Sequence, residues 1–349
     1  MIGLITDQHL DARKGSQIFW DYFMRFYNDV FFPTLQKHKV KTIIDLGDTF
    51  DNRKGIDFSA LNRIKREYYD TLEAMGITVH MIVGNHTSYY KNTNKINTPD
   101  LLLDSYNNIM TYSEIEDIMV EGTKITLIPW INSDNYNQVM KHISDTSSKI
   151  AMGHLELNGF VAHQGHVFEG GMNPDMFSKF DHVYSGHFHH KSSKDNISYL
   201  GNPYQIYWND YGDTRGFHLF DPTKNKVKFF ENPHQIFKKI FYNDSNVNYL
   251  ELDLTEYKDT YIKIVVEQKK DYYNFDKFIE SLYEIGVHEI KIIEDTNFNY
   301  ETDDVETNVE VVDTLTTLHN YIEDMNTNFD KSELKSLMKS IYVEACEIQ

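Results

Sequence analysis

The sequence predicts an α/β protein built from layered sheets and helices, and three observations support this fold class. Across residues 1–230, short runs rich in β-branched residues alternate with polar turns and with helical stretches. Nearly every such run ends directly in a cluster of Asp, Asn, Gly or His. The chain has 349 residues, of which 40% are hydrophobic and 25% charged, so it can bury one large core or two smaller ones.

The expected strands are the segments richest in β-branched residues, and two helices are expected between them. The strands are residues 2–6, 41–46, 78–83, 124–129, 149–152 and 182–185; the helices are residues 15–39 and 57–75, the second ended by a C-cap glycine at 76. Aromatic residues cover more than one face of the first helix, and they either pack on both the sheet and a neighbouring helix or form a homodimer contact. These residues are Phe19, Trp20, Tyr22, Phe23, Phe26, Tyr27, Phe31 and Phe32.

After residue 231 the pattern of expected strands and helices changes, and a separate domain is predicted. Residues 232–294 predict a small α+β domain with strands at 261–267 and 288–294 and a helix at 274–285. We expect residues 295–312 to form an acidic linker and residues 313–349 to contain two short helices. The second helix begins with a capping box and carries an apolar stripe that either folds back on its own domain or docks on another protein. The stripe consists of Leu334, Leu337, Met338, Ile341 and Tyr342.

The charge of the chain restricts the ligands that it can attract by itself. The net charge is −19, and residues 1–230 carry 23 Lys and Arg against 27 Asp and Glu, so most of the excess lies in the C-terminal third. A polyanionic substrate would therefore need bound cations or a partner to supply positive charge. No run approaches the roughly 18 apolar residues of a membrane span, the N-terminus does not resemble a secretory signal, and Cys346 stands alone. We expect a cytoplasmic protein.

Five polar clusters follow the expected strands and carry the chemistry. They are 7–9 (Asp-Gln-His), 47–51 (Gly-Asp-Thr-Phe-Asp), 84–86 (Gly-Asn-His), 153–154 (Gly-His) and 186–189 (Gly-His-Phe-His). They offer oxygen and nitrogen ligands only, which suits Mn, Fe, Zn or Mg and excludes a thiolate site. Single polar turn residues would be unremarkable, but their repetition at successive strand ends predicts one metal site assembled from distant segments. We expect the isolated histidines to be structural: His38, His80, His142 and His163.

The order of these clusters resembles the calcineurin-like metallophosphoesterases. Within them, the unbroken Gly-His-Phe-His at 186–189 and the segment 199–204 resemble the SbcD-type nucleases of double-strand-break repair. Segments 47–54, 154–160 and 215–217 are similar to the nuclease subunits of T-even phage recombination complexes. The resemblance implies a β-sandwich flanked by helices over residues 1–231, a small α+β capping domain over 232–294 that positions DNA, and a partner-docking element over 313–349.

The resemblance also implies two divalent metal ions, expected to be Mn²⁺ with Mg²⁺ as the alternative, that activate water for attack on phosphorus. One ion would be held by Asp7, His9, Asp48 and His189, and the other by Asp48, Asn85, His154 and His187. His86 would protonate the leaving 3′ oxygen, or would instead only orient Asn85. Asp51 is assigned to the catalytic group with His86, and an Asp at this position is typical of bacterial and phage members. Thr87 departs from the family, which usually has an acidic residue there.

The function implied is that of a DNA exonuclease and endonuclease, the nuclease subunit of a double-strand-break repair and recombination complex with an SbcC-type, SMC-like ATPase. The expected substrates are duplex ends and single strands, the expected assembly is a homodimer, and a phage-encoded chain would act in the host cell cytoplasm. DNA contact in the acidic small domain would rest on Lys238, Lys239, Lys269 and Lys270. A small-substrate phosphodiesterase or phosphatase, or a catalytically silent scaffold that binds DNA ends, are the alternatives.

Overall fold

The computed structural model describes residues 1–163, 165–294, 322, 331, 334, 335 and 338. The chain divides into two compact units, Met1–Phe298 and Asn299–Gln349. In the predicted docking stripe, Leu334 and Met338 are partly buried helical residues, whereas Leu337, Ile341 and Tyr342 lie outside the described residues. The predicted acidic linker 295–312 lies outside them as well. Among the described residues, no helix combines the length and the apolar character that crossing a bilayer requires.

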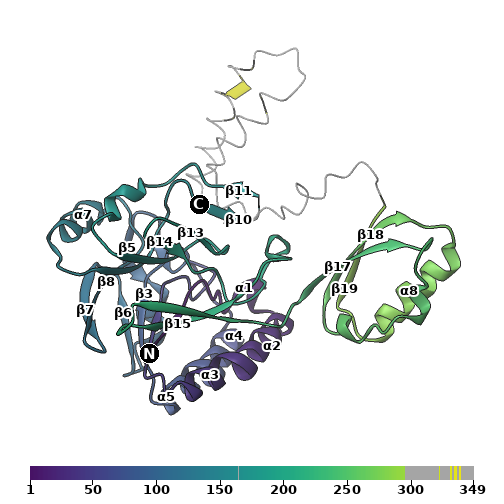
Figure 1. The fold of residues 1–349 in the computed structure, drawn as a ribbon, viewed down its shortest axis with the longest axis horizontal. Helices are drawn as coiled ribbons and strands as arrows, with labels where there is room; N and C mark the ends of the chain where they lie inside the picture. Colours follow the sequence, from purple (N-terminus) through teal and green to yellow (C-terminus); the bar gives the residue numbers. More distant parts are fainter. Residues whose placement is uncertain (164, 295–321, 323–330, 332–333, 336–337, 339–349) are drawn as a thin grey trace. The chain divides into compact units, whose positions relative to one another are not determined.

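Two six-stranded sheets form the body of the first unit (Figure 1). The first has the order β16 (Lys226–Glu231), β15 (Gly216–Asp221), β1 (Ile2–Ile5), β2 (Thr42–Asp45), β3 (Thr78–Ile82) and β6 (Ile109–Tyr112). The second has the order β13 (Ser192–Lys194), β14 (Ile197–Tyr199), β12 (His182–Gly186), β9 (Ile150–His154), β8 (Thr123–Ile128) and β7 (Glu116–Val120). In each sheet four neighbouring strands are parallel, so their carboxyl ends point to the same edge.

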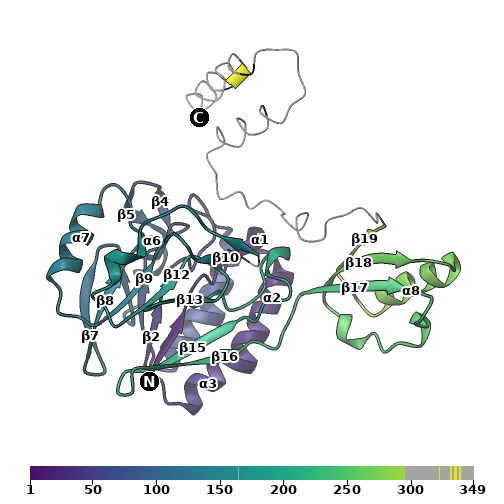
Figure 2. The ribbon, with the colours of Figure 1, turned by 45° about the horizontal axis from the view of Figure 1, so that its top comes forward.

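The sheets pack face to face, because alternate residues of their strands point into one shared apolar core. Leu4 and Ile44 from the first sheet and Leu127 and Met152 from the second are fully buried in it. The opposite face of each sheet is covered by helices, and this predicted β-sandwich flanked by helices is confirmed. In Figures 1 and 2, α2 and α3 run along one outer side of the body, and α7 lies at a different side.

The helices confirm the predicted segments 15–39, 57–75 and 274–285 to within three residues at each end, and they include two that the sequence did not predict, at residues 98–103 and 136–145. The helices are α1 (Ala12–Gly15), α2 (Gln17–Phe26), η1 (Tyr27–Phe31), α3 (Phe32–Lys37), α4 (Phe58–Arg63), η2 (Ile64–Tyr69), α5 (Asp70–Ala74), α6 (Thr98–Leu103), α7 (Tyr136–Asp145) and α8 (Tyr272–Glu284). Short 3₁₀ segments occur at η3 (Pro174–Phe177), η4 (Trp208–Asp210), η5 (Tyr249–Glu251) and η6 (Thr255–Tyr257). Two small hairpins complete the body: β4 (Ser88–Tyr90) with β5 (Thr93–Asn97), and β10 (Val161–His163) with β11 (His166–Val167).

The aromatic helix is buried within its own chain. The eight aromatic residues named from the sequence are all at most 7% exposed. They lie in the core between the first sheet and the helix formed by α4, η2 and α5. The ring of Tyr27, for example, lies 4.6 Å from that of Tyr68 on η2. The first of the two alternatives, packing on both the sheet and a neighbouring helix, is therefore confirmed. These residues do not provide a homodimer contact.

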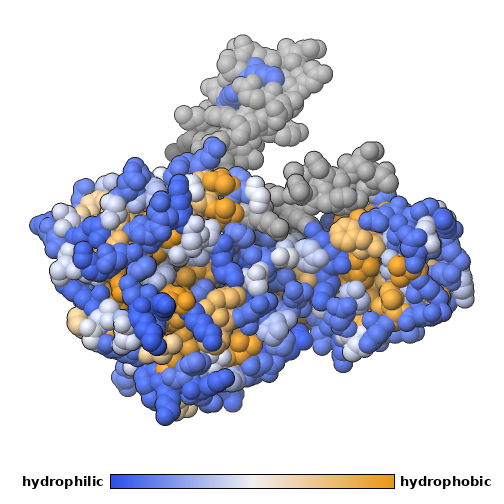
Figure 3. Space-filling model, in the orientation of Figure 1, coloured by the Kyte–Doolittle hydropathy of each residue, from blue (hydrophilic) through white to orange (hydrophobic). Residues whose placement is uncertain are grey.

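The small α+β fold has a three-stranded parallel sheet, β17 (Phe237–Asn243), β18 (Tyr261–Gln268) and β19 (Glu289–Ile293), with α8 on one face. The sequence predicted β18, α8 and β19 but missed β17. The start of β17 is anchored by Gln205, whose Oε1 accepts hydrogen bonds from the backbone N of Ile236 and Phe237 at 3.0 Å. The face drawn in Figure 3 is mostly hydrophilic, as expected when the large apolar side chains occupy interior cores.

Candidate metal centre

The five predicted clusters meet at one edge of the sandwich, because each follows the carboxyl end of a parallel strand. Asp7 and His9 follow β1, Asp48 follows β2, Asn85 and His86 follow β3, His154 ends β9, and His187 and His189 follow β12. The strand register aligns these ends within each sheet: Gly186 of β12 lies opposite His154 of β9. Across the first sheet, the backbone N of Asp7 donates to the carbonyl of Gly47 at 2.9 Å.

Two of the motif glycines are required by close approach of an acidic side chain. A Cβ added to Gly84 would lie 2.1 Å from Oδ1 of Asp48. A Cβ added to Gly186 would lie 1.9 Å from Oγ1 of Thr6 and 2.9 Å from Oδ2 of Asp7. Any larger residue at either position would displace a carboxylate of the centre.

One donor cluster consists of Asp7, His9 and His189, whose candidate ligand atoms all lie within 4.8 Å of one another. Asp7 and His9 are buried, and the Nε2 atoms of His9 and His189 are 3.2 Å apart. The Asp7 carboxylate is fixed by Oγ1 of Thr6, which donates to it at 2.7 Å, and by the backbone N of His187, which donates at 3.0 Å.

The second cluster consists of Asp48, His154 and His187, all buried, with Asn85 beside them. Nε2 of His154 lies 3.0 Å from Oδ2 of Asp48 and 2.8 Å from Oδ1 of Asn85. Nδ1 of His187 lies 3.0 Å from the same Asn85 oxygen. The structure thus brings together every residue that the sequence assigned to metal binding.

Three of the candidate histidine ligands have an oxygen atom near the outward ring nitrogen, and for His154 this contact is a hydrogen bond. Nδ1 of His9 lies 3.0 Å from Oδ1 of Asp51, and Nδ1 of His154 lies 2.9 Å from the carbonyl of Leu46. Nε2 of His187 lies 3.3 Å from Oε2 of Glu156. A proton on each outward nitrogen leaves the inward nitrogen with a free electron pair, which is how histidine ligands are commonly oriented around metals.

The buried acids and histidines perturb each other's ionisation. Burial opposes charge on Asp48, but the neighbouring His154 outweighs it and holds the pKa of the Asp48 carboxyl far below its usual range. Burial likewise opposes charge on His154, yet the Asp48 carboxylate raises the pKa of this imidazole to about 9. Burial of Asp51 is also outweighed, because the hydrogen bond with His9 and its charge lower the pKa of the Asp51 carboxyl. Asp48 and His154, which are both buried, are therefore arranged to carry opposite charges.

The donor set fits divalent cations. It contains imidazole nitrogens, carboxylate oxygens and one amide oxygen, a mixture suited to Mn, Fe or Zn. The Nε2 atoms of His9 and His189 face each other at 3.2 Å, a distance that leaves room for only one proton between them. A metal cation could instead accept the electron pairs of both nitrogens. His80 and His142, which the sequence assigned to structural roles, contact Tyr112 at 2.8 Å and Asp117 at 3.0 Å, away from both clusters.

His86 and Asp51 lie at the open side of the centre. The His86 side chain is 28% exposed, and its Nδ1 lies 2.8 Å from the backbone carbonyl of Asp51 and 3.9 Å from the Asp51 carboxylate. The backbone N of His86 donates to Oδ1 of Asp48 at 2.8 Å. Thr87 is buried, and its hydroxyl bonds to both the backbone N and the carbonyl of Gly84, closing the turn that carries Asn85 and His86.

Sequence reasoning missed three residues that support this centre. Glu156 holds the outward nitrogen of His187. Arg215 donates to the backbone carbonyl of His189 and to Asn202, and it forms an ion pair with Asp210 at 3.1 Å. Oδ1 of Asp210 in turn lies 3.8 Å from Nδ1 of His189. Glu156 and Arg215 lie inside segments 154–160 and 215–217, whose similarity to phage nucleases could have indicated a functional role. No sequence feature indicated a role for Asp210.

Comparison with known proteins agrees with this geometry. Residues 1–191 match the family described as calcineurin-like phosphoesterase. The chain belongs to this family. Over 314 residues it is 32% identical to exonuclease subunit 1 of Enterobacteria phage T4, and the match covers 89% of this chain and 90% of that protein.

Solved structures with low sequence identity also match this phosphoesterase. A dimetal phosphatase from Danio rerio is 13% identical, with a TM-score of 0.42, over 62% of this chain and 90% of that one. The nuclease MPE from Pseudomonas putida is 12% identical, with a TM-score of 0.27, over 66% and 87% of the two chains.

Proposed function

We propose that this phosphoesterase is a metal-dependent DNA exonuclease and endonuclease, acting as the nuclease subunit of a repair and recombination complex with an SbcC-type ATPase. The observation that carries the proposal is the convergence of two nitrogen and oxygen donor clusters beside a partly exposed histidine, His86. Family membership supports phosphoester hydrolysis. The phage T4 relative, an exonuclease subunit by name, supports DNA as the substrate and a complex as the setting.

In this proposal Asp7, His9, Asp48 and His189 hold one cation, and Asp48, Asn85, His154 and His187 hold the other. Two bound cations, with Mn²⁺ preferred over Mg²⁺, would supply Lewis-acid stabilisation and an activated water. The protein fixes the ligands in advance: the backbone N–H groups of His86 and His187 bind the two carboxylates, and Thr6 adds a third donor.

His86 is proposed as the proton donor to the leaving group. When Nδ1 of His86 carries a proton, the Asp51 carbonyl 2.8 Å away accepts it, and in the imidazolium form the ring has a further proton on Nε2 to give. Water adds to phosphorus, the P–O3′ bond breaks, and this proton passes to O3′, leaving a 3′-hydroxyl and a 5′-phosphate. We assign Asp51 to positioning, because its carboxylate contacts His9 and its carbonyl holds His86.

The domain division 1–231, 232–294, 295–312 and 313–349 and the docking role of residues 313–349 belong to the same proposal. Deleting residues 330–349 is expected to abolish association with the ATPase while metal binding persists. An intact complex after the deletion would rule out the docking role of the stripe. The proposed homodimer is tested by sedimentation of the full-length chain, and a monomer at all concentrations would exclude it.

The test of the nuclease is digestion of end-labelled linear duplex DNA with Mn²⁺ or Mg²⁺, comparing wild type with Asp48→Asn and His86→Ser. Metal-dependent cleavage lost in both variants supports the proposal. If wild type cleaves bis-p-nitrophenyl phosphate but no DNA, even after the ATPase subunit is added, the chain is a small-substrate phosphodiesterase. If neither substrate is cleaved while the ATPase subunit binds tightly, the chain is a scaffold.

A further inference from the structure

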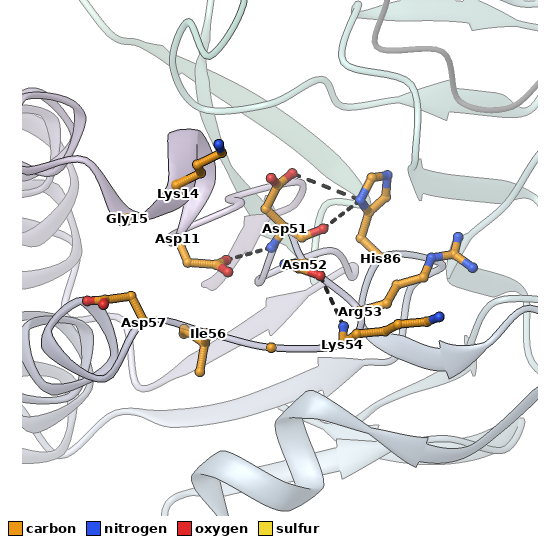
Figure 4. Close-up of a pocket in the computed structure, with 11 residues that line it drawn as sticks. Asp11, Lys14, Gly15, Asp51, Asn52, Arg53, Lys54, Ile56, Asp57 and His86 are labelled. Atoms are coloured by element: carbon orange, nitrogen blue, oxygen red, sulfur yellow. Dashed lines mark hydrogen bonds and ion pairs between the residues drawn. The ribbon is translucent and has the colours of Figure 1, made fainter. Parts of the chain in front are cut away.

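An open cleft of about 620 Å³ borders the metal centre at His86. Its walls come from two loops, residues 11–15 after β1 and residues 51–57 after β2 (Figure 4). Asp51 and His86 line both the cleft and the candidate metal centre, so the two spaces are continuous. A substrate bound at His86 would therefore extend into this cleft.

Three cationic side chains line the cleft: Lys14, Arg53 and Lys54. Within the described residues none of them forms an ion pair with a protein carboxylate, in contrast to several lysines elsewhere on the chain. Nη1 of Arg53 is buried and has no hydrogen-bond partner among the described residues. A buried guanidinium nitrogen without a partner is costly, which indicates that a ligand supplies the missing acceptor.

The acidic residues of the cleft are already engaged by the protein. Asp11 accepts a hydrogen bond from the backbone N of Asp51 at 2.6 Å, and Asp57 caps α4 by accepting from the backbone N of Ala60 at 2.9 Å. The Asp51 carboxylate contacts His9. The three carboxylates are therefore held by contacts with the protein, whereas the three cations have no carboxylate partner among the described residues, on a chain whose net charge is −19.

Three of the four lysines that the sequence assigned to DNA contact in the small domain already have a side-chain partner within the chain. Lys238 pairs with Glu256 at 3.0 Å, and Lys269 pairs with Glu294. The ammonium group of Lys239 lies over the ring of Tyr211, 4.9 Å from its centroid. The positive charge of the cleft, in contrast, lies beside the metal centre, on side chains that line the cleft together with His86 and Asp51.

We propose that this cleft binds the phosphate one nucleotide beyond the scissile bond, on the side of the leaving 3′ oxygen, with Arg53 as its principal ligand. This inference rests on the proposed function. His86 is placed to protonate that oxygen, and the cleft begins at His86, so the strand continuing from the oxygen enters it. A guanidinium matches a phosphate with two parallel N–H···O bonds, which a lysine cannot reproduce.

The backbone conformation of the first loop supports a ligand-binding role. Arg13, Lys14 and Gly15 are consecutive left-handed residues, with φ of 55°, 60° and 69°. This conformation is unfavourable for the two residues that carry a Cβ, and such strain concentrates at binding sites. The left-handed backbone places Lys14 on the rim of the cleft. Figure 4 shows Lys14 and Arg53 on either side of Asp51.

The test compares two dinucleotides that differ only by the proposed phosphate. Hydrolysis of d(TpT) and of d(pTpT) breaks the same P–O3′ bond, but only d(pTpT) carries a 5′-phosphate on the leaving nucleotide. With Mn²⁺, wild type is expected to prefer d(pTpT) by about tenfold to a hundredfold in kcat/KM, the range of a charged hydrogen bond. In Arg53→Gln this preference falls towards one, and Arg53→Lys keeps part of it. Arg66→Gln, at an exposed arginine that lines a different cleft, is the control and keeps the full preference.

A second measurement does not depend on turnover. For binding of a labelled single-stranded oligonucleotide, loss of one phosphate contact reduces the slope of log K against log salt by about 0.7. Arg53→Gln should show this reduction and Arg66→Gln should not. An unchanged slope, or a wild type that cleaves both dinucleotides equally well, overturns the inference. If the wild type hydrolyses neither dinucleotide but Arg53→Gln still reduces the slope, the phosphate site is supported, and the proposed nuclease is decided separately by the digestion of duplex DNA.

Discussion

Replacing Arg215 by Met tests how much a buried ion pair beside the metal centre contributes to the stability of the fold. Arg215 is 5% exposed, and its Nη2 lies 3.1 Å from Oδ1 of Asp210 and 3.1 Å from Oδ2 of Asp213. It also donates to the carbonyl of His189 and to Asn202. Met preserves much of the volume and removes the cation. The Asp210 carboxylate, 2% exposed, then keeps its bonds from the backbone N of Ile206 and Tyr207 but loses its charged partner.

The expected cost follows from leaving a carboxylate buried without its cation. Breaking a buried pair by removing one partner destabilises a protein by about 3–5 kcal/mol. The measurement is the urea midpoint of unfolding at unchanged m-value. The control is Lys95→Met, which breaks a solvent-exposed pair with Asp134, 75% and 46% exposed, and is expected to leave the midpoint unchanged.

The pH dependence has a definite sign. Burial opposes ionisation of Asp210, but Arg215 outweighs it and holds the pKa of the Asp210 carboxyl below its usual value. This contribution to stability is complete above the unfolded pKa of about 3.9 and is lost as the pH falls towards the folded pKa. The deficit of Arg215→Met should therefore be largest near neutral pH and shrink on acidification. A neutral-pH loss below about 1 kcal/mol, far under that of a broken buried pair, or a deficit that grows in acid would refute the reasoning.

Three further predictions concern the residues around the ligands. Glu156→Gln should weaken Mn²⁺ binding about 10- to 100-fold in calorimetric titration, because the carboxylate that orients His187 is lost, while Glu169→Gln at an exposed position should not. Thr87→Val should cost about 1–3 kcal/mol of unfolding free energy by leaving the Gly84 N–H unpaired, and Thr87→Ser should retain most of it; equal stability of both variants would contradict this. Saturating Mn²⁺, at about 100 times its Kd, should stabilise wild type by about 2.7 kcal/mol in thermal unfolding, reversibly with EDTA and much less in Asp48→Asn; equal gains would place the metal elsewhere.

The sequence predicts the strands of the centre well because each strand and its polar end are local in the chain. The six expected strands correspond to β1, β2, β3, β8, β9 and β12, within two residues at each end. Every ligand type could be read from the residue following a strand. Strand pairing could not be read in this way, since β15 joins β1 from more than 200 residues away, with Phe220 opposite Ile2.

The residues that support the centre could not be predicted from the sequence either, because they act through contacts between residues far apart in the chain. Glu156, Asp210 and Arg215 act through contacts with His187 and His189 that only the folded chain creates. The local sequence around a carboxylate does not show whether its side chain orients a metal ligand or simply faces solvent. The cations of the cleft were equally invisible, because Arg53 is singled out only by its place beside His86 together with a buried Nη1 that finds no hydrogen-bond partner within the described part of the chain.

The aromatic helix, whose composition alone suggested no function, is linked by the structure to the metal centre. The hydroxyl of Tyr27 donates to Oε1 of Gln8 at 2.6 Å, and the hydroxyl of Tyr204 donates to the Gln8 carbonyl at 2.6 Å. Gln8 stands between Asp7 and His9, and its Nε2 donates to Asp45 at 2.7 Å. Because both hydroxyls are buried and bound to Gln8, the backbone that carries two candidate ligands is held by the aromatic core of the first sheet. Rigidity of the first donor cluster is therefore a property of the aromatic packing as much as of the strand that precedes it.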